Sequence, residues 1–318
     1  MLIWTGCLLL ISLLIAFISS LFSQQTAFNI IQWFQTGAAY YLALILLMYG
    51  FNKIFKYQFP FPEPNILFTP VGQLDQDILF WSTMGTSHSY SVFSGIMEVV
   101  PAFLLLFRKT RILGAFIAFF VLLHVFMINV AFGISVKLFS GFLLLLALYL
   151  IIPHLKRVLL FFIGNESAGI NFDHSNKIKF YFLIKSVIIG LFLIEAMGPA
   201  FSVGYFNGDH QPKPPYHGAY TLRENGQGIA RVFFHKNNYF ITQNEKSVFE
   251  SYAYQLYFSK PSPLIKLYRK KTEIGTLKIK GTQEGDRLYN FSGTFAGTTI
   301  NWYGIKVDLE KLPLYPSP

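Results

Sequence analysis

The 318-residue chain contains a single cysteine, Cys7, and only 13% of its residues are Asp, Glu, Lys or Arg. One cysteine cannot form an internal disulfide, which excludes a disulfide-stapled fold. We interpret Cys7 as a small apolar residue of a helix. Soluble domains carry about 25% charged residues. The low charge therefore excludes an ordinary soluble protein for the chain as a whole.

Known catalytic and cofactor motifs are also missing. The sequence has no P-loop, no Gly-x-Gly-x-x-Gly, no Gly-x-Ser-x-Gly and no nucleic-acid-binding motif. His210, His217 and His235 do not have the close spacing of zinc ligands. We therefore predict no metal site and no nucleic-acid partner, and no cofactor can be read from the sequence. Whether the protein is an enzyme stays open.

Long apolar runs are what the sequence does have. Hydrophobic residues make up 53% of the chain and concentrate before residue 200. A membrane-spanning helix needs about 20 mostly apolar residues. Six stretches meet this length, at about 2–22, 36–54, 90–107, 112–132, 136–153 and 178–199. We expect an α-helical membrane bundle of about six transmembrane helices, with the lipid bilayer as its first partner.

Basic residues predict the orientation of these helices, since loops rich in Lys and Arg stay in the cytoplasm. The Arg-Lys-Thr-Arg turn at 108–111 and the loop after Pro153 together carry seven basic residues. The loop at 57–89 has acidic residues but no Lys or Arg. This pattern predicts a multi-pass protein whose C-terminal part lies outside the cytoplasm.

The sequence changes character after residue 200. Residues 201–218 are rich in Gly and Pro and are typical of a linker. Turn residues then separate seven short segments rich in β-branched and aromatic residues, which we expect to be strands, at 229–235, 238–242, 247–258, 264–269, 274–281, 288–297 and 299–309. We expect residues 219–318 to form an all-β domain, either an antiparallel sandwich or a small barrel. Residues 201–318 carry a net charge of +6, from 15 basic and 9 acidic residues, which we interpret as the solvent face of strands.

Two ionisable residues lie inside the apolar runs. Glu98 is about 15 Å from Arg108 along a helix, and His124 is about 20 Å from Arg111. Both therefore lie near the bilayer centre on consecutive helices. A charge at that depth costs roughly 2.5–3.5 kcal/mol unless it has a partner. We predict that Glu98 faces the bundle interior and contacts a polar side chain, with His124 as the expected partner.

Three more polar residues extend this candidate site. Asn129, Lys137 and Lys53 lie at the expected outer ends of their helices and can line the mouth of the same pocket. Each of them alone is also typical of a residue that reaches the membrane surface. The Glu98 pair has two readings: a hydrogen bond that pins two helices, or a site that handles protons or a quinone headgroup.

Residues 36–155 contain a set of short motifs: Gly50-x-x-Lys53, Gly95-x-x-Glu98, the basic turn, the Asn129 region and Val-Lys-Leu at 136–138. In these motifs the segment resembles the DoxX family of bacterial four-helix membrane proteins. The sequence departs from the family pattern at Ser135, where a proline is expected. The resemblance implies a location in the bacterial inner membrane and a link to quinone-dependent redox complexes. Partners would then be proteins of such a complex or of the cell envelope.

These observations predict five segments. Residues 1–35 form a first transmembrane helix and a short loop, 36–155 the DoxX-like bundle, 156–200 a cytoplasmic loop and sixth helix, 201–218 the linker and 219–318 the β domain. Two functions follow. One is a quinone-linked redox subunit with a polar site at Glu98 and His124. The other is a non-catalytic envelope protein whose bundle anchors a β module that binds a protein, lipid or glycan.

Overall fold

The computed structural model of the chain describes residues 24–163, 178–223, 228–257, 263–281 and 287–315. The chain divides into two compact units. The first is a helical bundle that includes the chain up to Phe55 and Val92–Gly204. The second combines Lys56–Ser91 with Tyr205–Pro318. Residues 56–91, which fall inside the 36–155 segment expected to form the bundle, thus lie in the same compact unit as the strands.

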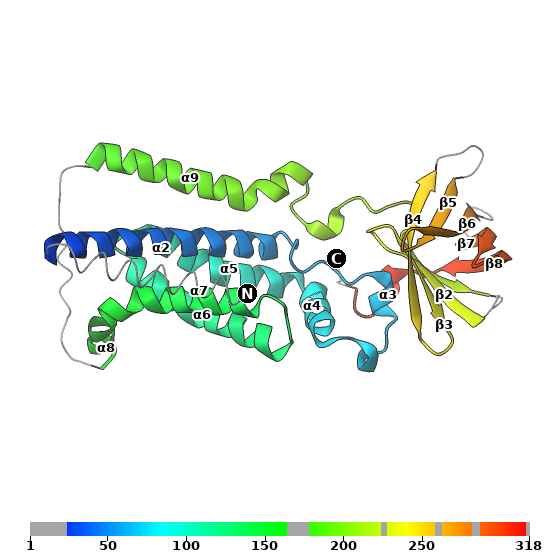
Figure 1. Cartoon of the computed structure of the whole chain (residues 1–318), viewed down its shortest axis with the longest axis horizontal. Coiled ribbons are helices and arrows are strands. Elements are labelled where there is room, and N and C mark those ends of the chain that lie inside the picture. Colours follow the sequence, from blue (N-terminus) through cyan, green and yellow to red (C-terminus); the bar gives the residue numbers. More distant parts are fainter. Residues whose placement is uncertain (1–23, 164–177, 224–227, 258–262, 282–286, 316–318) are drawn as a thin grey trace. The chain divides into compact units, whose positions relative to one another are not determined.

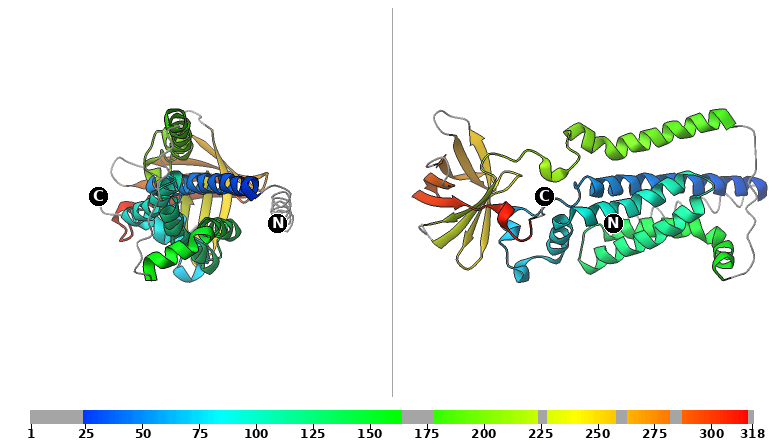
Figure 2. Two further views of the ribbon diagram at one scale, coloured as in Figure 1. Left: turned by 90° about the vertical axis from the view of Figure 1, so that its left-hand side faces the viewer. Right: turned by 180° about the vertical axis from the view of Figure 1, so that it is seen from behind.

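The long helices of the bundle run side by side, and the short α8 turns away at the end of α7 (Figures 1 and 2). Their bounds are α2 Gln24–Ile54, α5 His88–Leu106, α6 Arg111–Ala131, α7 Lys137–Ile151, α8 Leu155–Ile163 and α9 Ile178–Val203. A single 3-10 turn, Ile152–His154, joins α7 to α8. Helix α2 already includes residues 24–35, where a loop was expected, because no Gly or Pro interrupts that stretch.

Five helices in the described part of the chain are long and apolar enough to cross a membrane. They cover Asn29–Ile54, His88–Leu106, Arg111–Ala131, Lys137–His154 and Leu183–His210. The first expected span, at residues 2–22, lies outside the described residues. The prediction of an α-helical bundle with several helices able to span a membrane is therefore confirmed, while the count of six stays a prediction.

Small residues make the core of the bundle. Ala39, Ala43, Ala102, Ala115, Ala118 and Ala147 are all fully buried, among leucines of the same helices. Helices in lipid associate through close van der Waals packing, which small side chains allow. Gly114, near the start of α6, follows the same rule, because a Cβ there would lie 2.7 Å from the backbone N of Leu105.

The described residues of the second unit form two short α-helices and eight strands. The helices are α3 Pro64–Leu67 and α4 Gln76–Thr86, and the strands are β1 Gly218–Leu222, β2 Ile229–Phe234, β3 Tyr239–Asn244, β4 Phe249–Tyr257, β5 Leu264–Arg269, β6 Thr272–Gly281, β7 Leu288–Phe295 and β8 Thr298–Lys306. Single 3-10 turns lie at Val71–Gln73, Gly208–His210 and Leu309–Lys311.

The eight strands form a closed antiparallel barrel in sequence order (Figure 1). It closes where β1 pairs with β8, with Tyr220 opposite Lys306. The all-β prediction is confirmed, and the barrel is the alternative that holds. Strand β1 was not predicted, because its five residues follow directly on the Pro-rich segment and do not alternate between polar and apolar.

Aromatic rings fill the barrel. Phe234 stacks with Phe291 at 6.3 Å between ring centroids, and Tyr220 meets Phe291 edge-on at 5.3 Å. Further buried rings come from Phe240, Tyr252, Tyr254, Phe295 and Trp302. An eight-stranded barrel has an interior that side chains can fill or that can hold one small ligand. In this barrel the buried rings pack against one another in the interior and form its core.

Candidate functional sites

Glu98 is paired with Lys53 inside the bundle. The Lys53 Nζ lies 2.5 Å from Glu98 Oε1, and the two residues are 4% and 3% exposed. The prediction that Glu98 faces inward and contacts a polar side chain is confirmed. Its expected partner was wrong, because Lys53 takes the place proposed for His124.

Two glycines explain how this pair forms. A Cβ on Gly95 would lie 2.5 Å from the backbone oxygen of Gly50, and one on Gly50 would lie 2.6 Å from Val99 Cγ2. Only residues without a side chain allow helices α2 and α5 to touch so closely. Lys53 and Glu98 each follow one of these glycines by three residues, so the crossing brings their side chains together.

The remaining predicted residues lie apart from this pair. His124 is exposed on the surface of α6, and Lys137 is exposed at the start of α7. Asn129 is buried, but it donates from Nδ2 to Ser140 Oγ at 2.9 Å and links α6 to α7. His124 was predicted as the partner because it lies at about the same depth in the membrane as Glu98. Depth does not predict which side of a helix a residue faces, and the rotation of α6 about its axis turns His124 outward.

Glu98 keeps one carboxylate oxygen unpaired within the described part of the chain. Its Oε2 is buried and makes no hydrogen bond there, while Oε1 contacts Lys53. A buried polar atom without a partner costs about 1–3 kcal/mol. The pair is therefore one of the few places in the bundle where polarity is retained at a cost.

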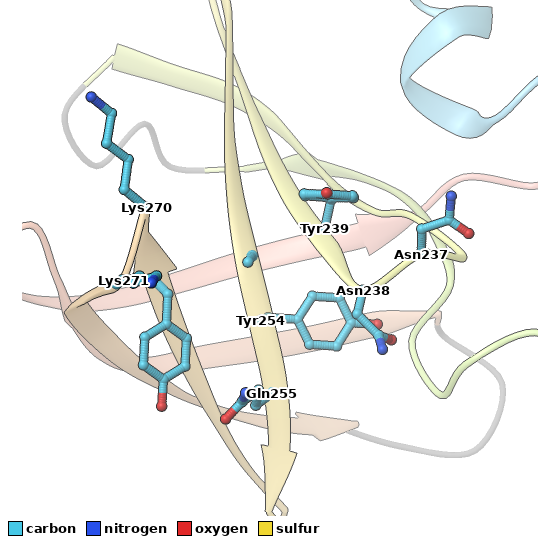
Figure 3. A pocket seen from close by; sticks show the side chains of 9 residues that line it. Asn237, Asn238, Tyr239, Tyr254, Gln255, Lys270 and Lys271 are labelled. Carbon is cyan, nitrogen blue, oxygen red and sulfur yellow. The ribbon is translucent and has the colours of Figure 1, made fainter.

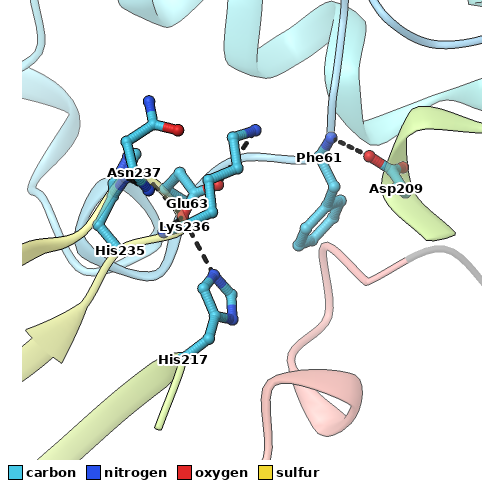
Figure 4. A network of polar contacts seen from close by, with 7 residues as sticks. All are labelled: Phe61, Glu63, Asp209, His217, His235, Lys236 and Asn237. Atoms are coloured by element: carbon cyan, nitrogen blue, oxygen red, sulfur yellow. Dashed lines mark hydrogen bonds and ion pairs between the residues drawn. The ribbon is translucent and has the colours of Figure 1, made fainter. Parts of the chain in front are cut away.

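A second polar cluster joins the 56–91 segment to the barrel (Figure 4). The carboxylate of Glu63, just before α3, is its centre. His217 Nε2 lies 3.1 Å from Glu63 Oε2, and His235 Nε2 lies 3.7 Å from the same oxygen. Lys236 contributes its Nζ at 3.2 Å from Oε1 and its backbone N–H at 3.3 Å from Oε2.

The protons in this cluster can be placed from its hydrogen bonds. A carboxylate only accepts, so His217 Nε2 carries the hydrogen that it shares with Glu63. In His235, Nδ1 accepts from the backbone N–H of Asn237 at 3.0 Å. The hydrogen of a neutral His235 is therefore on Nε2, which faces Glu63.

The charges around Glu63 change its acidity. Burial alone raises the pKa of Glu63, but the His217 hydrogen bond and the charges of His235 and Lys236 outweigh it and lower the pKa to about 2. Burial lowers the pKa of His235, with Glu63 opposing this and Lys236 adding to it. Glu63 is thus ionised under physiological conditions.

A third polar contact holds the start of the segment. Lys56 is buried and pairs with Asp209, whose Oδ1 accepts from the backbone N–H of Phe61 at 2.7 Å (Figure 4). A Cβ on Gly208 would lie 2.6 Å from the backbone oxygen of Lys56, so the two chain segments touch directly. The supposed linker at 201–218 is therefore held in place at Asp209 and His217.

Sequence reasoning missed both contacts. Residues 56–63 and 208–217 are more than 140 positions apart, and neither the histidine spacing nor the Gly and Pro content reveals such a pairing. No pattern in the sequence links Glu63 to His217 or His235. No group of three or more His, Cys, Asp or Glu in the described ranges could hold a metal ion.

A surface pocket of about 410 Å³ lies on the outside of the barrel (Figure 3). The turn between β2 and β3 supplies Asn237, Asn238 and Tyr239. Strand β4 supplies Ala253, Tyr254 and Gln255, and the end of β5 with the next turn supplies Tyr268, Lys270 and Lys271. The pocket shares the β2–β3 turn with the Glu63 cluster, since His235 and Lys236 directly precede Asn237.

The structure thus defines a class of protein: a bundle of helices able to span a membrane, joined to a closed antiparallel β-barrel. The chain belongs to the family of the Bacillus subtilis (strain 168) protein named "Uncharacterized protein YwoB". The two are 32% identical over 111 residues, which cover 35% of this chain and 70% of that protein. No family model and no solved structure matches the chain.

Proposed function

We propose that the protein is a membrane-anchored binding protein, in which the helical bundle is the anchor and the outer surface of the barrel is the binding module. The observation that carries this proposal is the filled barrel with a pocket on its outside. Aromatic rings occupy the interior, so a ligand has to be bound at the surface. The 410 Å³ volume lies within the roughly 300–1,000 Å³ of typical ligand pockets.

The bundle supports the role of an anchor. Its polar pair is shielded from the surroundings, because Glu98 and Lys53 are only 3% and 4% exposed and the backbones of α2 and α5 touch beside them. A quinone headgroup has no access to such a pair without a change in the bundle. The basic loops support a location in the bacterial inner membrane with the barrel outside the cytoplasm, which is part of the same proposal.

A second candidate is the DoxX-like role of a quinone-linked redox subunit. The observation that favours it is the unpaired Oε2 of Glu98, a buried acceptor that a hydroxyl donor from a quinol could satisfy. His124 takes no part in this version, since it lies on the outer surface of α6. Redox partners would have to supply the electrons.

One experiment separates these candidates. The full-length protein is purified in mild detergent, and co-purifying lipids, quinones, glycans and proteins are identified by mass spectrometry. The variant Ala253→Val places a larger side chain on the pocket floor, and its matched control, Ser251→Val, changes an exposed residue two positions earlier on the same strand. Valine is a good strand residue, so both variants should fold.

The binding-protein proposal expects a molecule that is present with the wild type and Ser251→Val but lost with Ala253→Val. A quinone that co-purifies with all three proteins and is lost with Glu98→Gln would support the redox candidate. Identical co-purifying molecules in every variant would contradict both.

A further inference from the structure

The pocket has a floor and two aromatic walls set by strand register. Tyr239 on β3 is opposite Ala253 on β4, and Ala253 is opposite Tyr268 on β5. Neighbouring strands are about 4.8 Å apart, so the two tyrosines are separated by about 10 Å across a small residue. Tyr239 is 45% exposed. This arrangement is a trough that fits a flat, partly apolar ring.

The polar groups of the pocket both donate and accept hydrogen bonds. Asn237, Asn238 and Gln255 carry amides, each with two N–H donors and a carbonyl acceptor. Gln255 Oε1 accepts from Tyr257 at 2.9 Å, which orients this amide on the outer face of β4. Vicinal hydroxyl groups also donate and accept, so three amides around a trough match a polyhydroxylated ring.

The charged residues that line the pocket are all basic. They are Lys270 and Lys271, and none of the nine lining residues is acidic. Lys270 has a φ of 58°, in the left-handed region that favours Gly or Asn.

The Glu63 cluster fixes one wall of the pocket. His235 and Lys236 bind Glu63, and the next residues, Asn237 and Asn238, line the pocket. The backbone N–H of Tyr254 donates to the backbone oxygen of Asn238 at 2.8 Å, which ties the turn to the pocket floor. The backbone that carries Asn237 and Asn238 is thus held in place before a ligand arrives, which lowers the entropic cost of binding.

We propose that this pocket binds an acidic carbohydrate, with a sugar ring between Tyr239 and Tyr268 and its acid group at Lys270 and Lys271. This inference rests on the proposed function. A free phosphate would leave the tyrosine faces and the amide carbonyls unused. A single-stranded nucleic acid also stacks on aromatic rings, and its binding is therefore an outcome of the test.

The test uses the full-length protein in nanodiscs of uncharged lipid and measures binding by calorimetry. The probes are a galacturonic acid pentamer, the same pentamer with its carboxyl groups reduced, and a single-stranded RNA oligonucleotide. We expect the acidic pentamer to bind at least about tenfold more tightly than the reduced one. Ala253→Val should abolish binding of both, and Ser251→Val should not change it.

Charge is tested separately. Lys270→Asn removes the charge and suits the left-handed backbone, so it should fold at least as well as the wild type and bind the acidic pentamer about threefold to fivefold more weakly. Lys246→Asn makes the same change in the turn between β3 and β4, away from the pocket, and should have no effect.

Equal affinity for the acidic and reduced pentamers, no binding of either, or tighter binding of RNA would overturn the inference. If the sugars fail but Ala253→Val still loses a co-purifying molecule, the proposed function holds and only the ligand class is wrong. If Ala253→Val changes nothing in either experiment, the proposed function fails as well.

Discussion

Replacing Glu63 by Gln should destabilise the barrel unit and remove part of its sensitivity to acid. The folded-state pKa of about 2 compares with an ordinary value of 4.5. This difference of about 2.5, at about 1.36 kcal/mol per pKa unit, gives about 3 kcal/mol of stability from the ionised carboxylate. Because the folded pKa is depressed, this stability is present above pH 4.5 and is lost as the pH falls from 4.5 towards 2.

The measurement is chemical unfolding of the full-length protein in detergent, followed by near-ultraviolet circular dichroism of the barrel aromatics at pH 7, 5 and 3. The wild type should lose stability most steeply below pH 4.5, and Glu63→Gln should start about 3 kcal/mol lower and lose less. Glu310→Gln, at an exposed carboxylate of the same unit, is the control. Equal stability of wild type and Glu63→Gln at pH 7 would refute the reasoning.

Three further predictions follow from the contacts. The pKa of His235 is lowered in the folded state, so the wild type should already lose some stability as the pH falls below 6.5. The variant His235→Asn should not show this loss, because Asn does not titrate and its side-chain oxygen can still accept from the backbone N–H of Asn237. Unfolding at pH 7.5 and 5.5 checks this. Lys53→Met alone should cost about 3–5 kcal/mol because it leaves Glu98 buried without its cation, and adding Glu98→Leu should recover most of the loss in detergent melts. Gly95→Ala should cost about 1–3 kcal/mol through the contact with Gly50, whereas Gly190→Ala, with open space at its Cβ, should be neutral or stabilising in the same melts.

Much of the fold could be predicted from composition and periodicity. Apolar runs of about 20 residues predicted the spanning helices, because lipid selects for length and polarity alone. Alternating residues predicted seven of the eight strands. The exception is β1 at 218–222. It is short and residues on both of its faces are buried, so its sequence does not alternate between polar and apolar residues.

The candidate sites were predictable only in part. Glu98 stood out because a carboxylate in an apolar run needs a partner, and that inference is confirmed. Its partner depended on helix phase and on the glycine contact, and His124 was predicted in place of Lys53. The equal spacing in Gly50-x-x-Lys53 and Gly95-x-x-Glu98 is the sequence signal that could have identified Lys53. The Glu63 cluster could not be predicted, since it joins residues 154 and 173 positions apart.

Photo-crosslinking in living cells tests the central claim most directly. A photoreactive amino acid is placed at Gln255, inside the pocket, and in a second strain at Ser251, outside it on the same strand. After irradiation, the mass of the purified full-length protein is measured. The account predicts a discrete adduct from Gln255 that is absent from Ser251 and disappears when Ala253→Val is added. Adducts of equal mass and yield from both positions, or none from Gln255, would contradict a binding site at this pocket.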